Sequence, residues 1–530
     1  MNRDEPVVPD HVQVVIAGGG PVGLAAAVEL GRRGIDVLVV ETRPQVSHLR
    51  PRCKTVNVRT MEHLRRWGIA DEFRKRAPLP VSWSQDIAFC TTLTGRELSR
   101  FHGVLGLVAE GDRFAEVGQQ APQYAFEELL RDTVTGIPSC RLVTGASVLS
   151  MRQGEGAVEV DVVGPEGSVT VTAAFVVGCD GARSIVREEM GARYEGEHAL
   201  RPNFGMVFTA PDLMAHVAHG PAVQYWILNE AAPALMGPLD RDGTWWIILF
   251  GVDEERGREH GRELVAAAIG AEVGADLDIT IGSTDPWTAR MQLVDSARAG
   301  RAFLAGDAAH LNPPFGGHGM NTGVGDAVDL GWKLAAVLQG WGGPALLDSY
   351  EQERRPVQLR VIEEATANMK VLSTELTDPR LDVDDPSGEL ARKAAHERIQ
   401  QTKHAEFHAL DLVLDMGYAS ALLMPPEGDA VVGHRLAHVW LDDAKSLYDV
   451  LGEGFALLQV GGADVPDEWA ACAASLGIPL RIVDLRNHAL SERYGAELLL
   501  VRPDQHVAWR GSATDDSSEA VLRTATGWEI

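Results

Sequence analysis

The stretch Val12-Gln-Val-Val-Ile-Ala-Gly-Gly-Gly-Pro-Val-Gly23 lies near the start of this 530-residue chain. Its first six residues are mostly apolar, which predicts a strand buried on both faces of a parallel sheet. Gly18, Gly20 and Gly23 have the G-x-G-x-x-G spacing. This spacing allows a tight turn, the close approach of a pyrophosphate, and close packing of a helix on the strand. The stretch therefore predicts a dinucleotide-binding strand, turn and helix.

The helix predicted after this turn runs from about Pro21 to Arg33 and ends near Gly34. Its N-terminal amides would face the phosphates. The next predicted strand, Val37–Val40, is followed by Glu41. A carboxylate at this position accepts hydrogen bonds from ribose hydroxyls and repels a 2′-phosphate. We therefore expect the tightly bound dinucleotide to be FAD or NAD rather than NADP.

A second segment, Gly178-Cys-Asp-Gly-Ala-Arg-Ser-Ile-Val-Arg187, follows a predicted strand over Val169–Val177. It places Asp180 and Gly181 at the end of that strand, and a helix is predicted from Ser184 to Met190. The N-terminal amides of this helix would face the same region as the first turn. The position at the end of an apolar strand favours a functional turn over an ordinary surface turn.

The third segment is Gly306-Asp-Ala-Ala-His-Leu-Asn-Pro-Pro-Phe-Gly-Gly-His-Gly-Met-Asn321, and the strand predicted before it is Ala302–Ala305. The helix predicted after it has an apolar stripe at Val324, Ala327, Val328, Gly331, Leu334, Ala335 and Leu338. A helix N-terminus can stabilise negative charge on the pyrimidine ring of a flavin, and glycines let the backbone approach a flat ring. A flexible surface loop would explain the glycines but not their place between a strand and an amphipathic helix.

Further elements are predicted from periodicity and turn residues. They are helices at 59–67, 123–131 and 344–372, strands at 142–149, 158–163, 439–441, 455–460 and 480–483, and a hairpin at 496–510 that turns at Pro503-Asp504. Stretches 223–228, 234–239 and 244–250 are expected to form strands of a separate sheet. In 244–250, alternate residues point to opposite sides of the sheet, and both sides are apolar. Either one face lines a site for an aromatic ligand, or both faces belong to the hydrophobic core. The acidic stretch 374–389 is expected to be a linker or an exposed excursion.

Composition limits the partners and the compartment. The formal net charge of −27 argues against nucleic acid or an anionic membrane as a partner, because both would be repelled. The five cysteines form no C-x-x-C pair and have no metal-ligand spacing, which indicates a reducing cytoplasm, no disulfide framework and no metal. The polar segment 1–13 has no secretory signal, and no apolar run is long enough to span a membrane. A cytoplasmic protein is expected.

The three segments, in this order, resemble those of the single-component FAD-dependent aromatic hydroxylases. This family includes p-hydroxybenzoate hydroxylase, phenol hydroxylase and polyketide-tailoring oxygenases, and the resemblance covers residues 11 to 373. It implies an α/β fold in which a Rossmann-like FAD-binding domain carries an inserted mixed β-sheet substrate domain and is followed by a thioredoxin-like C-terminal domain. The implied ranges are 1–80, 105–190 and 286–395 for the first, 81–104 and 191–285 for the second, and 425–530 for the third. Cys472 stands alone in the last domain, which favours a structural or homodimer-stabilising role over disulfide chemistry.

The resemblance also implies roles for individual residues. Beside Gly18, Gly20 and Gly23, the implied FAD contacts are Glu41 with the ribose, Arg52 and Gln123 near pyrophosphate and ring, Val148 beside the adenine, Asp180 near both FAD and the nicotinamide, Asp307 with the ribityl or pyrophosphate portion, and Gly319, Met320 and Asn321 along the N1–O2 edge of the flavin. His318 stands where the family usually has Gln, which leaves the role of this side chain open. The substrate-pocket candidates are Pro314, Phe315, Tyr225 and Trp246.

In such an enzyme FAD is bound non-covalently, NADPH or NADH is the transient reductant, and O2 forms a C4a-hydroperoxyflavin that hydroxylates a phenolic or polycyclic aromatic such as a polyketide. The protein supplies no nucleophile and no metal; it positions the reactants and excludes water. Baeyer–Villiger or epoxidising oxygenation is a close variant. Two other classes stay open, a flavin reductase or redox-sensing protein that uses no O2, and a halogenase. The adjacent Trp245 and Trp246 do not give the W-x-W-x-I-P pattern of the halogenases.

Overall fold

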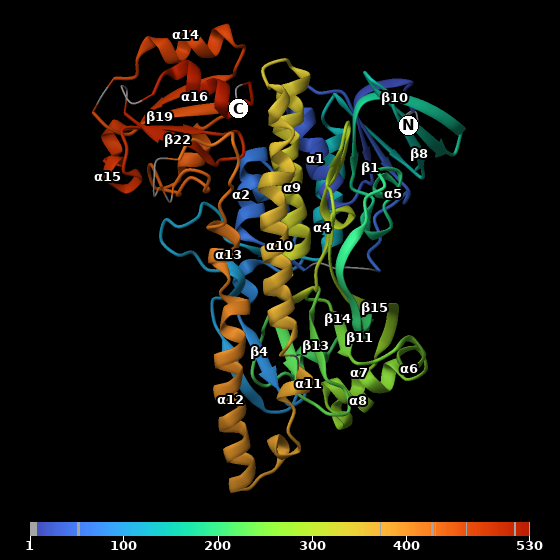
Figure 1. The fold of residues 1–530 in the computed structure, drawn as a ribbon. Coiled ribbons are helices and arrows are strands. Elements are labelled where there is room, and N and C mark those ends of the chain that lie inside the picture. The colour runs from blue at the N-terminus through green and yellow to red at the C-terminus, as the bar shows by residue number, and fades with distance from the viewer. Residues whose placement is uncertain are drawn as a thin grey trace.

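The computed structural model describes residues 8–49, 54–371, 373–425, 429, 431–462, 464–512 and 516–528, with the side chains at 198–200, 373 and 374 left out. Three sheets with separate hydrophobic cores lie around two long helices, α9 (His318–Leu338) and α10 (Ser349–Met369). Figure 1 shows these helices in yellow, running between the first sheet and the C-terminal sheet. No helix in the described part of the chain is long and apolar enough to cross a membrane.

The first sheet carries the three glycine-containing segments. Its strands are β1 (His11–Ala17), β2 (Val37–Glu41), β7 (Cys140–Thr144), β8 (Ser147–Gln153), β9 (Val158–Gly164), β10 (Gly167–Gly178), β16 (Arg298–Ala299) and β17 (Ala302–Leu304). The order is β16-β17-β10-β1-β2-β7, with β9 pairing with both β10 and β8. From β17 to β7 the neighbouring strands are parallel, so their C-terminal ends share one edge of the sheet.

Helices cover this sheet as the sequence predicts. α1 (Pro21–Arg32) packs on α4 (Gln123–Thr135) and α9, and shorter helices are α2 (Val58–Trp67), α3 (Ala70–Arg76) and α5 (Ile185–Glu189). α2 ends at Gly68, which has a φ of +77°. The prediction of one strand over 142–149 is wrong, because Gly145 turns the chain with a φ of +70° between β7 and β8.

The second sheet is mixed and contains the three strands expected to stand apart. It consists of β4 (Ile87–Cys90), β5 (Glu97–Phe101), β11 (Tyr194–Thr209), β12 (Gln224–Ile227), β13 (Ala234–Pro238), β14 (Thr244–Phe250), β15 (Thr280–Val294) and β18 (His310–Leu311), in the order β18-β15-β11-β14-β13-β12-β4-β5. One face packs on α7 (Gly261–Ile269), flanked by α6 (Glu254–Glu259) and α8 (Ala271–Asp276). The other face packs on Phe315 and on α12 (Pro386–Phe407). A small ladder of β3 (Thr55–Val56) and β6 (Gln119–Gln120) lies outside both sheets.

The stretch 374–389, predicted to be a linker or an exposed excursion, is partly helical. It holds α11 (Ser373–Leu376), an exposed turn and then α12, which returns along the second sheet beside β4 (Figure 1). Helix α13 (Leu410–Leu414) follows it. Although α12 is a long helix, its buried residues are few, and they include Ile399, Lys403 and Phe407.

The third sheet has the order β20-β19-β21-β22 and forms the C-terminal part of the molecule. Its elements are β19 (Phe455–Gln459), β20 (Leu480–Asp484), β21 (Leu498–Val501), β22 (Val507–Gly511), α14 (Asp467–Ser475), α15 (Ser491–Tyr494) and α16 (Ser518–Ala525). The predicted hairpin is confirmed as β21 and β22. The strand predicted over 439–441 is wrong, because this stretch is a loop with an isolated bridge between Trp440 and Ser446.

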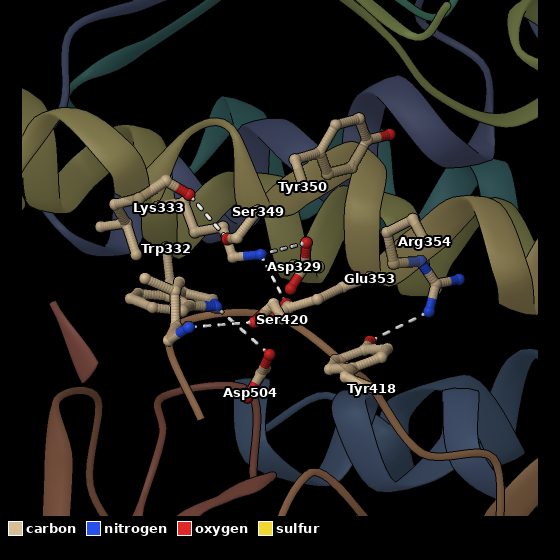
Figure 2. A network of polar contacts seen from close by, with 12 residues as sticks. Asp329, Trp332, Lys333, Ser349, Tyr350, Glu353, Arg354, Tyr418, Ser420 and Asp504 are labelled. Atoms are coloured by element: carbon tan, nitrogen blue, oxygen red, sulfur yellow. Dashed lines mark hydrogen bonds and ion pairs between the residues drawn. The ribbon is translucent and has the colours of Figure 1, made fainter. Parts of the chain in front are cut away.

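Buried charges join this third sheet to α9 and α10, as Figure 2 shows. Arg502, from the turn after β21, contacts Asp329 at 3.0 Å, Glu353 at 2.7 Å and Asp504 at 2.7 Å. Lys333 binds the same Asp329 and Glu353 at 2.9 and 2.6 Å. All five side chains are 0–2% exposed. The C-terminal sheet is therefore fastened to the helix that begins at the third glycine-containing segment.

Candidate functional site

The three glycine-containing segments meet at the C-terminal edge of the first sheet. The N–H of Gly18 donates to Val40 O, and the N–H of Cys179 donates to Ala17 O. On the other side of β10, the N–H of Ala305 donates to Gly178 O. Stretches separated by more than a hundred residues in sequence are thus adjacent in space. The structure builds one site from all three.

Glycine is required at two of the three positions in the first turn. Gly18 has a φ of +99°, and a Cβ there would lie 2.4 Å from Cys179 O. A Cβ on Gly23 would lie 1.9 Å from Gly18 O, so this glycine lets α1 pack closely on β1. Gly20 is different: a Cβ there would meet nothing within 4 Å. Its α-carbon therefore faces open space in front of the N-terminus of α1.

Glu41 lies at the end of β2 and turns back onto this first turn. One carboxylate oxygen accepts the N–H of Gly19 at 2.7 Å, and the other accepts the N–H and Nε of Arg43, both at 2.8 Å. Burial raises the pKa of Glu41, but the hydrogen bonds from Arg43 and Gly19 outweigh it and leave the pKa below its ordinary value. Glu41 is therefore an anionic acceptor at neutral pH, placed where the ribose of a dinucleotide is expected.

Asp180 follows β10 and caps the short helix α5. Its Oδ2 accepts the N–H groups of Ile185 at 2.8 Å and Val186 at 3.4 Å. Its Oδ1 is buried and has no hydrogen-bond partner among the described residues. Burial raises the pKa of Asp180, although hydrogen bonds from Ser184 and from the amides of Val186 and Ile185 oppose the rise. An unsatisfied buried oxygen at this edge leaves a position for a ligand donor.

The third segment rests on a residue that the sequence reasoning missed. Asp326, on α9 and fully buried, accepts the N–H of Gly306 at 3.1 Å, His310 Nε2 at 3.0 Å and Arg354 Nε at 2.8 Å. Burial raises its pKa, but the charges of Arg354 and His310 more than offset this and lower it to about 2. Asp326 thus fixes the turn at Gly306-Asp307. Asp326 lies away from the apolar stripe predicted for this helix, so the sequence pattern carried no signal of its burial.

The loop from Pro313 to Gly317, here called the flavin loop, leads directly into α9. The helix starts at His318, with Gly317 as its N-cap, no side-chain cap and no acidic residue in its first turn. The side-chain amide of Asn321 does not point into the site. It accepts the N–H of Asn57 at 3.0 Å and donates to Thr55 O at 3.0 Å and to Gly317 O at 2.7 Å. It therefore ties β3 to the loop and leaves the first amides of α9 without a side-chain cap.

His318 is buried under the same loop. A Cβ on Gly316 would lie 2.3 Å from its Nε2, and this atom has no hydrogen-bond partner among the described residues. Burial lowers the pKa of His318 to about 4, so the imidazole is neutral at physiological pH. A neutral ring in this place can donate or accept one hydrogen bond, as the amide of Gln would.

An aromatic wall faces the flavin loop from the second sheet. Phe315 is 4% exposed, and its ring centroid lies 6.2 Å from that of Trp226 and 6.1 Å from that of Phe250. Trp246 belongs to the same face and lies under Lys54, whose Nζ is 4.1 Å from the ring centroid. The placement of Tyr225 in this pocket is wrong. Its ring belongs to the opposite face of the sheet, and its hydroxyl donates to Gly220 O at 2.9 Å and accepts the N–H of Ala222 at 2.7 Å.

The remaining predicted residues are spread around the edge of the site. Gln123 is half-buried in the first turn of α4, Val148 is half-buried on β8, and Asp307 and Pro314 are exposed. Gly319 and Met320 lie in the first turn of α9. Arg52 lies outside the described residues. The described part of the chain holds no group of three or more side chains that could bind a metal ion.

These residues fit FAD. An open space in front of Gly20 faces a helix without a side-chain cap or an acid in its first turn, as a pyrophosphate requires. Glu41 offers the ribose a carboxylate, and Asp180 has an unused buried oxygen. The first turn of α9 presents uncapped amides beside an aromatic wall, where a flat ring could bind.

Comparisons with known proteins agree with this geometry. The model of the FAD binding domain family matches residues 11–365, and the model of the aromatic-ring hydroxylase C-terminal domain matches residues 429–528. The chain is similar to tetracenomycin B2 monooxygenase-dioxygenase of Streptomyces olivaceus, with 32% identity over 97% of each chain. It is also similar to the structure of the rebeccamycin biosynthetic enzyme RebC with reduced flavin, with a TM-score of 0.90 and 32% identity over 98% of this chain and 100% of that one. A complex of aklavinone-11 hydroxylase with FAD and aklavinone gives a TM-score of 0.82 and 29% identity over 98% of this chain and 100% of that one.

Fold and site together define an FAD-dependent monooxygenase of aromatic compounds. The chain belongs to the FAD-dependent aromatic-ring hydroxylase family and carries its C-terminal domain. The family and the fold class inferred from the three segments are both confirmed.

Proposed function

We propose that this enzyme uses NADPH or NADH together with O2 to hydroxylate a phenolic or polycyclic aromatic, with polyketides as the favoured class. The observation that carries the proposal is the contact between the flavin loop and the second sheet, where Phe315 lies against Trp226 and Phe250. A flat aromatic ligand beside this wall would lie close to the first turn of α9. Relatives named for tetracenomycin B2 and aklavinone support a polycyclic substrate, whereas relatives named for 2,4-dichlorophenol and 4-methyl-5-nitrocatechol support a simple phenol, so the choice of the polycyclic class rests on the aromatic wall.

The chain's own residues would hold and orient the reactants. Glu41 and the amides at the N-terminus of α1 bind the adenosine and pyrophosphate, and the first turn of α9 faces the pyrimidine edge of the flavin. When bound, FAD supplies the redox and oxygen-transfer chemistry. The aromatic wall excludes water and aligns the substrate ring. In this proposal residues 1–80, 105–190 and 286–395 form the FAD-binding domain, 81–104 and 191–285 the substrate domain, and 425–530 the C-terminal domain.

The test begins with the purified protein. We expect a bound flavin spectrum, and NADPH or NADH oxidation coupled to O2 consumption that is accelerated by aklavinone or a related polycyclic phenol. The product should gain one oxygen atom by mass spectrometry. A protein without flavin would contradict the proposal, and so would a flavoprotein whose reduced form does not react with O2, which is the reductase alternative.

The position of the new oxygen separates the remaining variants. An NMR spectrum that shows a new phenolic hydroxyl on an intact ring supports hydroxylation. A lactone or an epoxide would instead identify Baeyer–Villiger or epoxidising oxygenation, and would overturn the hydroxylase proposal while leaving the flavin site intact. If only simple phenols accelerate the reaction, the polycyclic substrate class is wrong.

A further inference from the structure

Lys54 reaches from the FAD-binding side of the molecule to the aromatic wall. Its carbonyl oxygen accepts the N–H of Ala121 at 3.1 Å, and the next residue, Thr55, begins the strand β3. Asn321 donates to Thr55 O, and a Cβ on Gly317 would lie 3.0 Å from Thr55 Cβ. The main chain of Lys54 is therefore one residue away from the contact with the N-cap of α9, where the flavin ring is proposed to bind.

The Lys54 side chain crosses to the second sheet and ends on Trp246. Its Nζ lies 4.1 Å from the ring centroid of Trp246, and the lysine is half-buried. A Cβ on Gly237, the residue opposite Trp246 on β13, would lie 3.0 Å from Trp246 Nε1, so the indole leans over this glycine. The face of an indole attracts and orients an ammonium group but does not neutralise its charge. A positive charge is thus placed at one end of the aromatic wall.

The wall has a partly open section between its two ends. Trp246, Ile248 and Phe250 point to the same side of β14, and Phe315 of the flavin loop lies against Phe250. Trp246 and Phe250 are buried, whereas Ile248 between them is half-buried. Four residues of a strand extend over about 13 Å. A polycyclic ring system over Ile248 would span this length, with the flavin loop at one end and Lys54 Nζ at the other, and a single phenol ring would not.

Lys403 also lies on this wall, but in a different environment. Its Nζ is 4.3 Å from the ring centroid of Trp226, yet its side chain is fully buried and pairs with Glu406 at 2.7 Å. A carboxylate therefore balances the charge of Lys403 within the protein, as burial requires. Lys54 is the cation that stands at the half-buried end of the wall, where a bound aromatic could reach it.

We propose that Lys54 is a specificity-determining residue that binds an ionised oxygen of the substrate, a phenolate or a carboxylate, at the end of a polycyclic skeleton remote from the flavin loop. The inference rests on the proposed function, because it narrows the substrate class of that site. Hydrogen bonds between charged groups are about twice as strong as those between neutral ones, and a nearby cation favours the ionised form of a phenol. Lys54 would therefore select acidic polycyclic aromatics over their neutral ethers.

The test measures binding of three probes to the full-length holoenzyme at pH 7 by calorimetry. The probes are 2-hydroxyanthraquinone, anthraquinone-2-carboxylate and the neutral 2-methoxyanthraquinone. We expect the wild type to bind at least one acidic probe about tenfold or more tightly than the ether, and the stronger of the two identifies the acidic group. Bound 2-hydroxyanthraquinone should absorb as its anion. Lys54→Met should reduce the preference to less than about threefold and leave the affinity for the ether nearly unchanged, whereas Lys54→Arg should recover most of the preference.

Lys75→Met is the matched control, because Lys75 is 73% exposed on α3 and its replacement removes the same charge away from the wall. It should leave all three affinities unchanged. Lys54→Gln covers the case in which Lys54→Met does not fold. An unchanged preference in the folded variant would overturn the proposal, and so would an equal loss for all three probes, which would mean that Lys54 only packs on Trp246.

Two further outcomes separate this inference from the proposals on which it rests. A wild type without any preference for an acidic probe overturns the inference even if the enzyme oxygenates an aromatic. A wild type that prefers an acidic probe through Lys54 but forms no oxygenated product overturns the proposed function and leaves the anion site standing. If Lys54→Met weakens FAD binding while the preference is unchanged, Lys54 belongs to the cofactor site and the inference is wrong.

Discussion

At the scale of single residues, the proposed role of Glu41 in cofactor binding follows from its contacts. It is almost fully buried, yet its lowered pKa keeps it charged because Arg43 and Gly19 donate to it. Hydrogen bonds to a charged group are stronger than those between neutral groups. A ribose hydroxyl that donates to Glu41 would therefore contribute strongly to FAD affinity.

Replacement of Glu41 by Ala should weaken FAD binding by about 2 kcal/mol, or roughly 30-fold, because a charge-assisted hydrogen bond is lost. Titration of the apoprotein with FAD, followed by flavin fluorescence, measures the change. Asp36→Ala is the control, since this carboxylate lies at the opposite end of β2 and pairs with Arg141. Equal FAD affinities for wild type and Glu41→Ala would remove Glu41 from the site.

His318 should make the stability of the protein depend on pH in a defined window. Its pKa is lowered to about 4 by burial, so below its ordinary pKa of 6.5 the unfolded chain binds a proton that the folded chain does not. Stability is therefore complete above pH 6.5 and falls as the pH decreases towards 4. The loss at pH 5 should be about 2 kcal/mol.

The variant His318→Gln isolates this contribution, because Gln does not titrate. The difference in unfolding free energy between pH 7 and pH 5, from urea denaturation, should be about 2 kcal/mol smaller in His318→Gln than in the wild type. The paired carboxylates of the protein are common to both and cancel in the comparison. Identical pH profiles would show that the imidazole is accessible to solvent.

Prediction of single residues from the sequence succeeded where only one local structure is compatible with the sequence pattern. Gly18 and Gly23 were identified from spacing, and each proves to lack room for a Cβ. The prediction that placed Tyr225 in the pocket, and did not name its neighbour Trp226, was different. Alternation along a strand shows that the two point to opposite faces, but not which face meets the flavin loop. That depends on how the second sheet packs, which is a tertiary property.

At the scale of elements, the first turn and α1 separate two roles of glycine. Gly20→Ala should fold normally, because its φ of −78° suits any residue and a Cβ meets nothing within 4 Å. The stability of the apoprotein should change by less than about 1 kcal/mol. FAD affinity should nevertheless fall at least tenfold, because the new methyl group occupies the space in front of the helix. Calorimetry of the apoprotein and FAD titration measure both effects.

Gly23→Ala is the counterpart in the same helix. Its Cβ would lie 1.9 Å from Gly18 O, so α1 must move away from β1. We expect a loss of about 3 kcal/mol in the apoprotein, as for overpacking in a core. If Gly20→Ala destabilised the apoprotein as much as Gly23→Ala, the space in front of α1 would not be a cofactor site.

Helix α12 shows why part of the structure was not predictable. Its inward face follows an interval of four residues through Ala391, Ala395, Ile399, Lys403 and Phe407, which is a helical stripe. Two alanines and a lysine in this stripe give it little hydrophobic contrast with the polar face. The lysine is buried only because Glu406 and Asn368 O satisfy it, and both partners are fixed by tertiary packing. Local sequence therefore carried no indication that this helix reaches the site.

At the scale of the whole molecule, the flavin loop is held from two directions. α12 contacts it from the side of the second sheet, and α9 extends from it to the third sheet, where Asp329 and Lys333 join the buried network of Figure 2. The sequence indicated the third sheet and its hairpin turn at Pro503-Asp504. It did not indicate that Arg502, just before this turn, and Asp504, within it, are buried against α9 and α10, because charged residues at a turn are ordinarily exposed.

Removal of Arg502 should therefore separate the C-terminal sheet from the rest of the molecule. Arg502→Met leaves Asp329, Glu353 and Asp504 buried with only Lys333 to balance them within this network. Breaking a buried ion pair in this way typically costs about 3–5 kcal/mol. We expect urea denaturation to show a loss of this size, and limited proteolysis to release a fragment that contains β19 to β22.

The control is Arg486→Met, whose exposed pair with Asp484 lies on the same sheet and should contribute about 1 kcal/mol or less. Arg502→Lys keeps a positive charge but loses the second arm of the guanidinium, so its stability should lie between those of wild type and Arg502→Met. A variant Arg502→Met that is as stable and as protease-resistant as Arg486→Met would show that apolar packing alone attaches the C-terminal sheet. A selective loss in Arg502→Met would instead show that the charges buried between α9, α10 and the hairpin determine how this sheet is attached.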